Sequence, residues 1–131
     1  MIERYTNPEM GNIWSDQAKY QTWLDVEIAA CEANCKLGKI PKSAMETIRT
    51  KASFKPERIL EIEEEVRHDV IAFLTNVNEY VGDSGRYIHV GMTSSDVLDT
   101  GLALQLKSSV KLLRKELLLL EDCLLYTSDA A

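Results

Sequence analysis

Apolar residues recur every three or four positions along most of this chain, which is the period of an amphipathic α-helix. The breaks in this period coincide with residues that start or stop helices: Asn7-Pro8, Ser15, Gly38 and Pro56. No run of alternating residues is long enough for a sheet. We therefore predict an all-α fold with helices over residues 8–14, 16–37, 40–48, 56–65, 70–81 and 96–125.

The last predicted helix would span about 45 Å at a rise of 1.5 Å per residue. Its apolar positions form one row, the pattern of a helix in a bundle: Leu98, Leu102, Leu106, Val110, Leu113, Leu117, Leu120 and Leu124. The short upstream helices cannot cover such a row, so further helices from missing chain or other subunits are expected. We predict an N-terminal helical domain over 1–95, the first long helix of a central bundle over 96–125, and an unrelated tail over 126–131 on a truncated fragment.

The start of this long helix carries the most suggestive polar residues. Arg86 to Met92 is rich in β-branched and aromatic residues and predicts an extended segment. Thr93, Ser94 and Ser95 then offer three N-cap hydroxyls, with Asp96 in the first turn. A helix start has unpaired N–H groups and a partial positive charge, so it can hold a carboxylate or phosphate. An ordinary capped helix is the alternative interpretation.

The net charge of −6 excludes a non-specific nucleic-acid binder, which needs a basic surface. Any anionic ligand must be held by local donors, for which Arg4, Arg67 and Arg86 are candidates. No window has the roughly 18 consecutive apolar residues of a membrane helix. Charged residues near the start argue against a secretory leader. We expect no membrane partner and a cytoplasmic location.

Polar residues gather in two further places. Arg4 and Tyr5 lie side by side before the first helix, and Arg67-His68-Asp69 lies at the expected joint between the fourth and fifth helices, where Asp69 is expected to cap the fifth. Loops at such joints can bring side chains onto a ligand. His89, between two β-branched residues, fits either a catalytic or a structural role. The alternative for Arg4 and Tyr5 is an ordinary surface pair. The alternative for His68 is a structural role as a helix cap or a hydrogen-bonding core residue.

The sequence contains no cluster of residues with metal-ligand spacing. The three cysteines, Cys31, Cys35 and Cys123, match neither a disulfide framework nor a zinc spacing. The chain also lacks a glycine-rich phosphate loop and a nucleophile elbow.

Together the segments Arg4 to Trp14, Arg67 to Phe73 and His89 to Thr100 resemble the adenylosuccinate lyase family of the fumarase/aspartase superfamily. The Thr-Ser-Ser-Asp element alone is common across that superfamily. The opening Arg-Tyr pair and the His-Asp-Val-Ile-Ala-Phe block point to the purine enzyme. The resemblance covers residues 1 to about 125.

The resemblance implies an all-α homotetramer that eliminates fumarate from succinyl-AMP and from the succinylated aminoimidazole-carboxamide nucleotide. It implies that the α-carbanion formed beside a carboxylate is stabilised by donors at Thr93 and Ser94. Arg4, Tyr5, Arg67, His68 and Asp69 match positions that contact the nucleotide, with His68 assisting catalysis. The family's catalytic base, a serine on a mobile loop, and its acid, a central-domain histidine, have no counterpart in this chain.

Two alternatives stay open at this point. Another superfamily lyase, such as argininosuccinate lyase or a cycloisomerase, would share the helical frame. A non-catalytic helical interaction module built around the leucine row would belong to a different class. The fragment itself is expected to lack activity.

Overall fold

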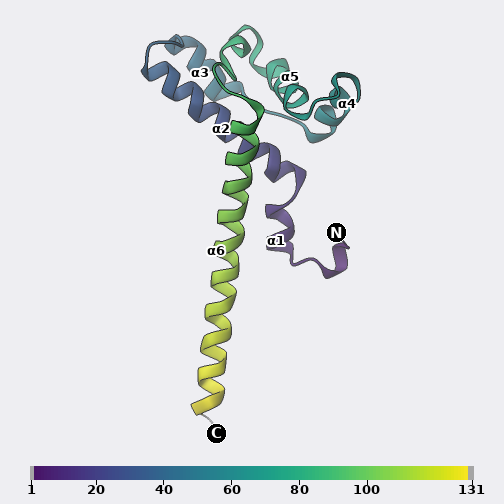
Figure 1. Cartoon of the computed structure of the whole chain (residues 1–131), viewed down its shortest axis with the longest axis vertical. Helices are drawn as coiled ribbons and strands as arrows, with labels where there is room; N and C mark the ends of the chain where they lie inside the picture. Colours follow the sequence, from purple (N-terminus) through teal and green to yellow (C-terminus); the bar gives the residue numbers. More distant parts are fainter. Residues whose placement is uncertain (1, 130–131) are drawn as a thin grey trace.

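The computed structural model describes residues 2–129, and this part of the chain is all-α, as the sequence predicts. A helical head sits at one end, and the last helix leaves it as a single long rod (Figure 1). The elements in chain order are η1 (Glu3–Tyr5), α1 (Pro8–Ile13), α2 (Asp16–Lys36), α3 (Lys42–Lys51), α4 (Pro56–Val66), α5 (Asp69–Val81), η2 (Gly82–Tyr87) and α6 (Ser94–Asp129), where η marks a 3₁₀-helix.

The residues predicted to start and end the first two helices do so in the structure, as their capping geometry shows. The Asn7 side chain accepts a hydrogen bond from the Met10 N–H at 3.1 Å, which caps α1. The Ser15 hydroxyl accepts from the Ala18 N–H at 3.2 Å and caps α2. Gly38 follows the end of α2 with a φ of +75°, which a glycine adopts without strain.

The head, residues 16–93, is organised around a cluster of aromatic rings. Tyr20 and Trp23 come from α2, Phe54 from the loop before α4, and Phe73 from α5; all four are buried. Phe73 stacks on Tyr20 with ring centroids 6.0 Å apart and meets Trp23 edge-on at 5.5 Å. Offset and edge-on pairs of this kind add to the free energy gained from apolar burial. The core therefore fixes α5 against the middle of α2.

The predicted extended segment over Arg86 to Met92 is wrong. The 3₁₀-helix η2 continues through Tyr87, residues 88–91 form a turn, and residues 2–129 contain no strand. The Ile88 N–H donates to the Gly85 carbonyl at 3.0 Å, so the chain makes local bonds where a strand would need a partner. Ile88 itself is buried, which anchors the turn to the head. β-branched residues here serve burial, not sheet pairing.

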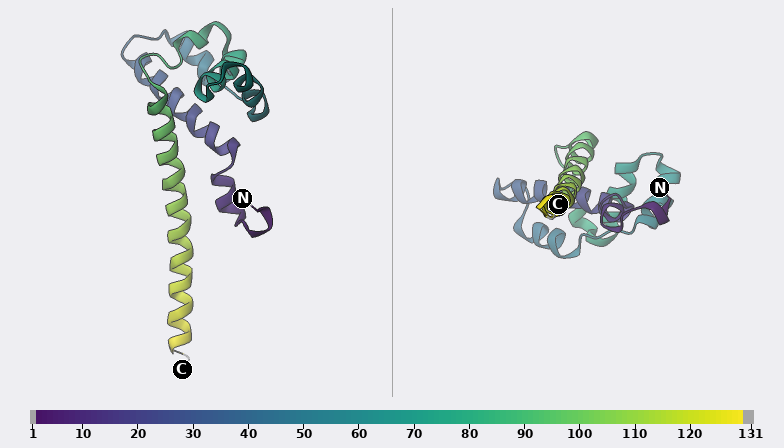
Figure 2. Two further views of the ribbon diagram at one scale, coloured as in Figure 1. Left: turned by 45° about the vertical axis from the view of Figure 1, so that its right-hand side comes forward. Right: turned by 90° about the horizontal axis from the view of Figure 1, so that it is seen from below.

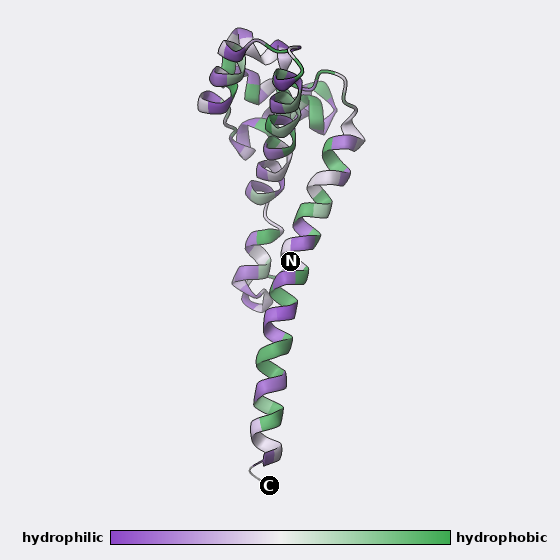
Figure 3. Cartoon of the chain, turned by 90° about the vertical axis from the view of Figure 1, so that its left-hand side faces the viewer, coloured by the Kyte–Doolittle hydropathy of each residue, from purple (hydrophilic) through white to green (hydrophobic). Residues whose placement is uncertain are grey.

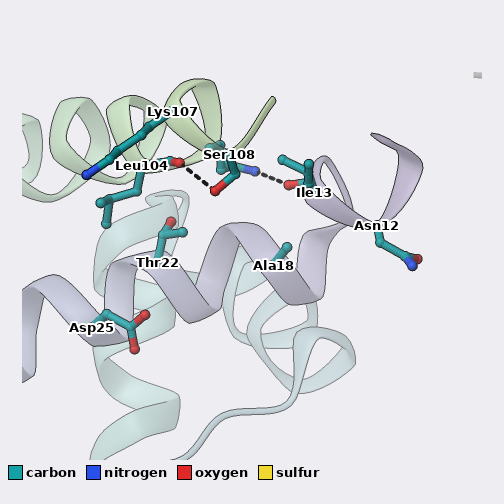
Figure 4. A pocket seen from close by; sticks show the side chains of 9 residues that line it. Asn12, Ile13, Ala18, Thr22, Asp25, Leu104, Lys107 and Ser108 are labelled. Atoms are coloured by element: carbon teal, nitrogen blue, oxygen red, sulfur yellow. Dashed lines mark hydrogen bonds between the residues drawn. The ribbon is translucent and has the colours of Figure 1, made fainter. Parts of the chain in front are cut away.

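Helix α6 crosses α2 at very short range. A Cβ atom added at Gly101 would lie 2.8 Å from Trp23 Cδ1 and 2.9 Å from Thr22 Oγ1, so this approach requires glycine. One turn further on, Gln105 Nε2 donates to the Ile13 carbonyl at 2.8 Å. Beside this crossing lies an open groove of about 490 Å³ between α6 and the α1–α2 segment (Figure 4).

Beyond Ser109, α6 runs clear of the head (Figure 2). Its next turns still lie beside α1, where Lys115 Nζ is 3.6 Å from Glu9 Oε1. Helix α6 continues to Asp129, four residues past the predicted end at Leu125. Its predicted leucine row is largely exposed, with Leu102 at 45%, Leu113 at 53% and Leu117 at 64% (Figure 3 colours the row by hydropathy). The expectation that the upstream helices cannot cover this row is confirmed. No described helix combines the length and the hydropathy needed to cross a membrane.

Candidate active site

The start of α6 is a helix N-terminus closed by reciprocal bonds. The Thr93 N–H donates to Asp96 Oδ2 at 2.8 Å, and the Asp96 N–H donates to the Thr93 carbonyl at 3.1 Å. This is the acidic half of a capping box, in which a first-turn carboxylate satisfies the N-cap amide. Within residues 2–129 the Thr93 and Ser94 hydroxyls make no hydrogen bond, so both can donate to a ligand. Thr93 is exposed and Ser94 half-buried.

The turn that delivers the chain to α6 has an unusual backbone. His89 has a φ of +65° and Gly91 a φ of +78°, both in the left-handed region. Glycine tolerates this region, whereas a histidine there is uncommon and needs support from its surroundings. The Met92 N–H donates to the His89 carbonyl at 3.4 Å, which closes the turn directly before Thr93.

The support for His89 comes from Glu27, a residue of α2 that the sequence reasoning missed. Glu27 is 1% exposed. Its Oε2 accepts from the His89 N–H at 3.0 Å, and its Oε1 lies 2.5 Å from His89 Nδ1. One signal was present: Glu27 falls on the same helical stripe as Tyr20, Trp23 and Cys31, where every other residue is apolar.

Glu27 lies among buried side chains. Cys31, one turn along α2, is 1% exposed, and its thiol donates to the Tyr87 carbonyl at 3.6 Å. Burial raises the pKa of the Cys31 thiol to about 11, with a smaller contribution from the charge of Glu27. A charged carboxylate in such a place needs a hydrogen-bonded partner, which His89 supplies.

The structure has the predicted break between α4 and α5, but the residue that caps α5 differs from the one predicted. Arg67 ends α4 in the left-handed conformation with a φ of +54°. The predicted cap, Asp69, is wrong: His68 precedes the helix in an extended conformation, and its Nδ1 accepts from the Ile71 N–H at 3.3 Å. Asp69 is the first helical residue, and its carboxylate accepts from the Val70 N–H at 2.7 Å. Arg67 turns the chain between the two helices, and the side chain of the next residue, His68, therefore reaches the first turn of α5.

Arg4 and Tyr5 form a small exposed pair in η1. The Arg4 guanidinium lies 4.8 Å from the centroid of the Tyr5 ring, and Tyr5 is 74% exposed. Neither side chain has a hydrogen bond to another described residue. Both are therefore available to a ligand, and neither is held rigidly by this chain.

The three clusters stay apart in this chain. Figure 1 shows η1 near the N-terminus beside α1, the α4–α5 joint at the outer end of those two helices, and the start of α6 against α2. Among residues 2–129, no hydrogen bond or ion pair links one cluster to another. The groove beside Gln105 is lined by none of their residues. Most of the predicted site residues are exposed, Asp69, His89 and Ser94 are half-buried, and together they do not form one complete pocket here.

Comparison with known proteins decides the family. The model of a family described as "Lyase" matches residues 3–130. The chain belongs to this lyase family.

Two curated relatives of the chain are adenylosuccinate lyases, which confirms the resemblance found in the sequence. The enzyme of Synechocystis sp. is 70% identical over 117 residues, and that of Bacillus subtilis is 50% identical over 117 residues. In both cases the match covers 89% of this chain and 27% of the relative. The chain thus spans about a quarter of the length of these lyases.

Solved structures of the same all-α fold also match. A fumarate lyase from Mesorhizobium sp. superposes with a TM-score of 0.73 at 26% identity, covering 83% of this chain and 26% of that one. A 3-carboxy-cis,cis-muconate lactonizing enzyme from Pseudomonas putida gives 0.78 at 30% identity, covering 86% and 27%. The helical frame of the chain is therefore that of several lyase-family enzymes.

Proposed function

We propose that this chain forms the N-terminal part of an adenylosuccinate lyase. The reaction is elimination of fumarate from succinyl-AMP and from the succinylated aminoimidazole-carboxamide nucleotide of purine synthesis. The single observation that carries the proposal is the 70% identity to the Synechocystis enzyme over 117 residues. Identity at that level, over nearly all of this chain, exceeds what a shared helical frame requires, since the lactonizing enzyme shares the frame at 30%.

The geometry at α6 suits one part of this chemistry. Removing a proton beside a carboxylate places extra negative charge on that carboxylate, which fixed donors stabilise. The free hydroxyls of Thr93 and Ser94 lie at a helix N-terminus, where a partial positive charge adds to their effect. We assign Thr93 and Ser94 to the substrate carboxylate. Arg4, Tyr5, Arg67, His68 and Asp69 are assigned to the nucleotide, with His68 assisting catalysis.

The base that abstracts the proton and the acid that protonates the leaving nitrogen are assigned to the part of the relatives that this chain does not span. The chain alone is then expected to be inactive, because loss of catalytic groups from a site that still binds costs several orders of magnitude in rate. No metal or organic cofactor enters the proposed reaction.

We further propose a homotetramer in the cytoplasm, with active sites shared between subunits. The separation of the three clusters supports shared sites, since one chain does not bring them together. The exposed leucine row of α6 supports assembly, because an apolar surface of this length is rarely left in water. The division into a domain over 1–95 and a bundle helix over 96–125 belongs to the same proposal.

A chimera tests the proposed function. Residues 3–120 of this chain would replace the matching segment of the Synechocystis enzyme, and fumarate release would be followed by absorbance with both nucleotides. We expect turnover close to that of the parent enzyme. A chimera that folds and assembles normally yet releases no fumarate from either nucleotide would contradict the proposal.

The Thr93 and Ser94 assignment is tested in the same chimera. Replacing both by Ala removes two hydrogen bonds to a charged group, each contributing about 1.5–3 kcal/mol. We expect kcat/KM to fall by at least two orders of magnitude. Ser95→Ala is the matched control, because Ser95 is exposed and is not assigned to substrate. An unchanged kcat/KM in the double variant would remove Thr93 and Ser94 from the site.

The second candidate is another lyase of this family that acts on a non-nucleotide acid. The TM-score of 0.78 to a lactonizing enzyme favours it over the remaining classes. Turnover of muconate-type acids or argininosuccinate by the chimera, without turnover of the purine substrates, would favour this candidate. A non-catalytic interaction module would show neither activity and no anion binding.

A further inference from the structure

The carboxylate of Glu27 is buried, and both of its oxygens serve a single residue. Oε2 accepts from the backbone N–H of His89 and Oε1 lies within hydrogen-bond distance of ring Nδ1, at 3.0 and 2.5 Å. No other hydrogen bond reaches the Glu27 carboxylate from residues 2–129. Its neighbour Cys31 donates to Tyr87 instead. Burying an acidic side chain with one partner is costly, so the pairing calls for a specific role.

The two bonds fix the tautomer of His89. An ionised carboxylate can only accept, so Nδ1 must carry a proton in both the neutral and the charged imidazole. Nε2, on the opposite side of the ring, has no hydrogen-bond partner within residues 2–129. The His89 side chain is 20% exposed, and Nε2 is not among the fully buried unpartnered atoms, so this side can be reached. A histidine held at one nitrogen and open at the other is arranged to act on a ligand through the open one.

The same carboxylate also fixes where the ring lies. By accepting from the His89 N–H, it supports the left-handed backbone of a residue placed four positions before Thr93. Backbone and ring are thus held by one rigid group from α2, in the core of the head. An orienting carboxylate behind a functional histidine commonly fixes both tautomer and direction.

We propose that Glu27 is a positioning residue that acts through His89. It presents Nε2 of His89 to the substrate bound beside the start of α6. This inference rests on the proposed function for its catalytic part, and on the Glu27–His89 geometry for its structural part. The two parts have separate tests.

The structural part is tested by ¹⁵N NMR of the imidazole rings in the 131-residue chain. The chain has two histidines, and the proposal assigns them opposite tautomers. Neutral His89 should carry its proton on Nδ1, whereas His68, whose Nδ1 accepts from Ile71, should carry it on Nε2. Glu27→Gln keeps an acceptor for the backbone N–H and removes the charge, so His89 should lose the Nδ1–H tautomer while His68 is unchanged.

Asp25→Asn is the matched control, because Asp25 lies on the same helix, is exposed and carries the same charge. It should leave both tautomers as they are. An Nε2–H tautomer for His89 in the unaltered chain would overturn the structural part. That measurement needs no variant, so it decides the point even if Glu27→Gln does not fold.

The catalytic part is tested in the chimera by a double-mutant cycle. Glu27→Gln should lower kcat/KM by about 10–100-fold, the usual loss when an orienting carboxylate is removed. In a His89→Ala background, the same change should cost less than about twofold, since Glu27 then has nothing to position. Glu27→Asp, which retains the charge, should recover part of the loss. Asp25→Asn should have no effect.

The outcomes separate the two proposals. An equal loss from Glu27→Gln with and without His89 would show that Glu27 acts by some other route and would overturn the inference. An inactive parent chimera would overturn the proposed function and the catalytic part with it. The NMR result would still decide whether Glu27 fixes the tautomer of His89.

Discussion

The head and the distal half of α6, residues 110–129, are both rich in apolar residues, yet only the head buries them. Phe73 in the head is fully buried among other rings, whereas Leu117 on α6 is 64% exposed. In the distal half, only Leu112 is even half-buried. The comparison shows that apolar periodicity marks a surface that must be covered and does not say which chain covers it. The head completes its core with the first turn of α6, through Val97, whereas the distal half of α6 leaves its apolar side chains exposed.

The proximal half of α6 shows how this chain makes its own contact. The buried residues there recur every fourth position and are mostly small or polar: Val97, Gly101, Gln105 and Ser109. Small residues let two helices approach closely, as Gly101 does over Trp23. The leucine row lies elsewhere on the helix and is largely exposed. One helix thus carries two contact faces of different chemistry.

The largest expected effect is on the head. Phe73→Ala removes a fully buried ring from the aromatic cluster and should lower the free energy of unfolding by about 3–5 kcal/mol. Leu117→Ala removes an exposed side chain and should change it by less than about 0.5 kcal/mol. Urea titration followed by circular dichroism measures both. Equal effects would mean that the distal half of α6 is folded back onto the head.

Thiol labelling compares the same two regions. Cys123 on α6 is exposed and Cys31 is buried, so iodoacetamide at pH 8 should alkylate Cys31 on the order of 100-fold more slowly. Mass spectrometry of timed digests gives both rates. Similar rates would show that the head opens readily.

The raised pKa of Cys31 also predicts a loss of stability in alkali. Folding favours the neutral thiol, so this stabilisation is present below the usual pKa of 9.0 and is lost as the pH rises toward 11. Cys31→Ala should remove this part of the pH dependence in urea titrations at pH 8, 9.5 and 11. A Cys31→Ala variant with the same alkaline loss as the unaltered chain would assign that loss to other groups.

A smaller effect on stability is expected where α6 crosses α2. Gly101→Ala should destabilise the chain by about 1–3 kcal/mol, because the new methyl group would overlap the buried Trp23 ring. Helix propensity alone would give the opposite sign, since alanine is about 1 kcal/mol better than glycine inside a helix. Thermal unfolding by circular dichroism gives the sign. A stabilised variant would mean that α6 does not cross α2 this closely.

The smallest effect on stability should come with a clear change in assembly. The isolated chain is expected to self-associate through the leucine row, and Leu113→Glu with Leu117→Glu should make it monomeric in sedimentation velocity. The free energy of unfolding of the head should move by less than about 0.5 kcal/mol. Lys111→Glu, also exposed on α6, is the control for added charge. A monomeric unaltered chain at high concentration would rule out this role for the row.

Helix positions were predictable because their signals are local. Asn7, Ser15 and Gly38 act through bonds or dihedral angles within four residues of themselves, so the sequence contains the whole cause. The availability of Thr93 and Ser94 at a helix start follows from the same local logic. The exposure of the leucine row was predictable because the last helix is too long for the short upstream helices to cover.

The features that the sequence did not predict depend on contacts between distant residues or on the local backbone conformation. Glu27 contacts His89 across 62 residues. Its place on the apolar stripe of α2 indicates burial, but no short-range pattern indicates which residue it contacts. His68 replaced Asp69 as the cap because Arg67 adopts a left-handed turn, which shifts the helix start by one residue. The segment before α6 has strand-like residues without a strand to pair with. In each case the tertiary surroundings decide between local options.

The glycine crossing has a mechanical consequence for α6. Gly101 divides the helix into arms of about 12 Å toward Thr93 and about 42 Å toward Asp129, at 1.5 Å per residue. A rigid lever pivoted there scales movement by the ratio of its arms. A tilt of about 5° that shifts the far end by about 4 Å moves the Thr93 end by only about 1 Å. A displacement of the distal helix is thereby reduced about 3.5-fold at the Thr93 end.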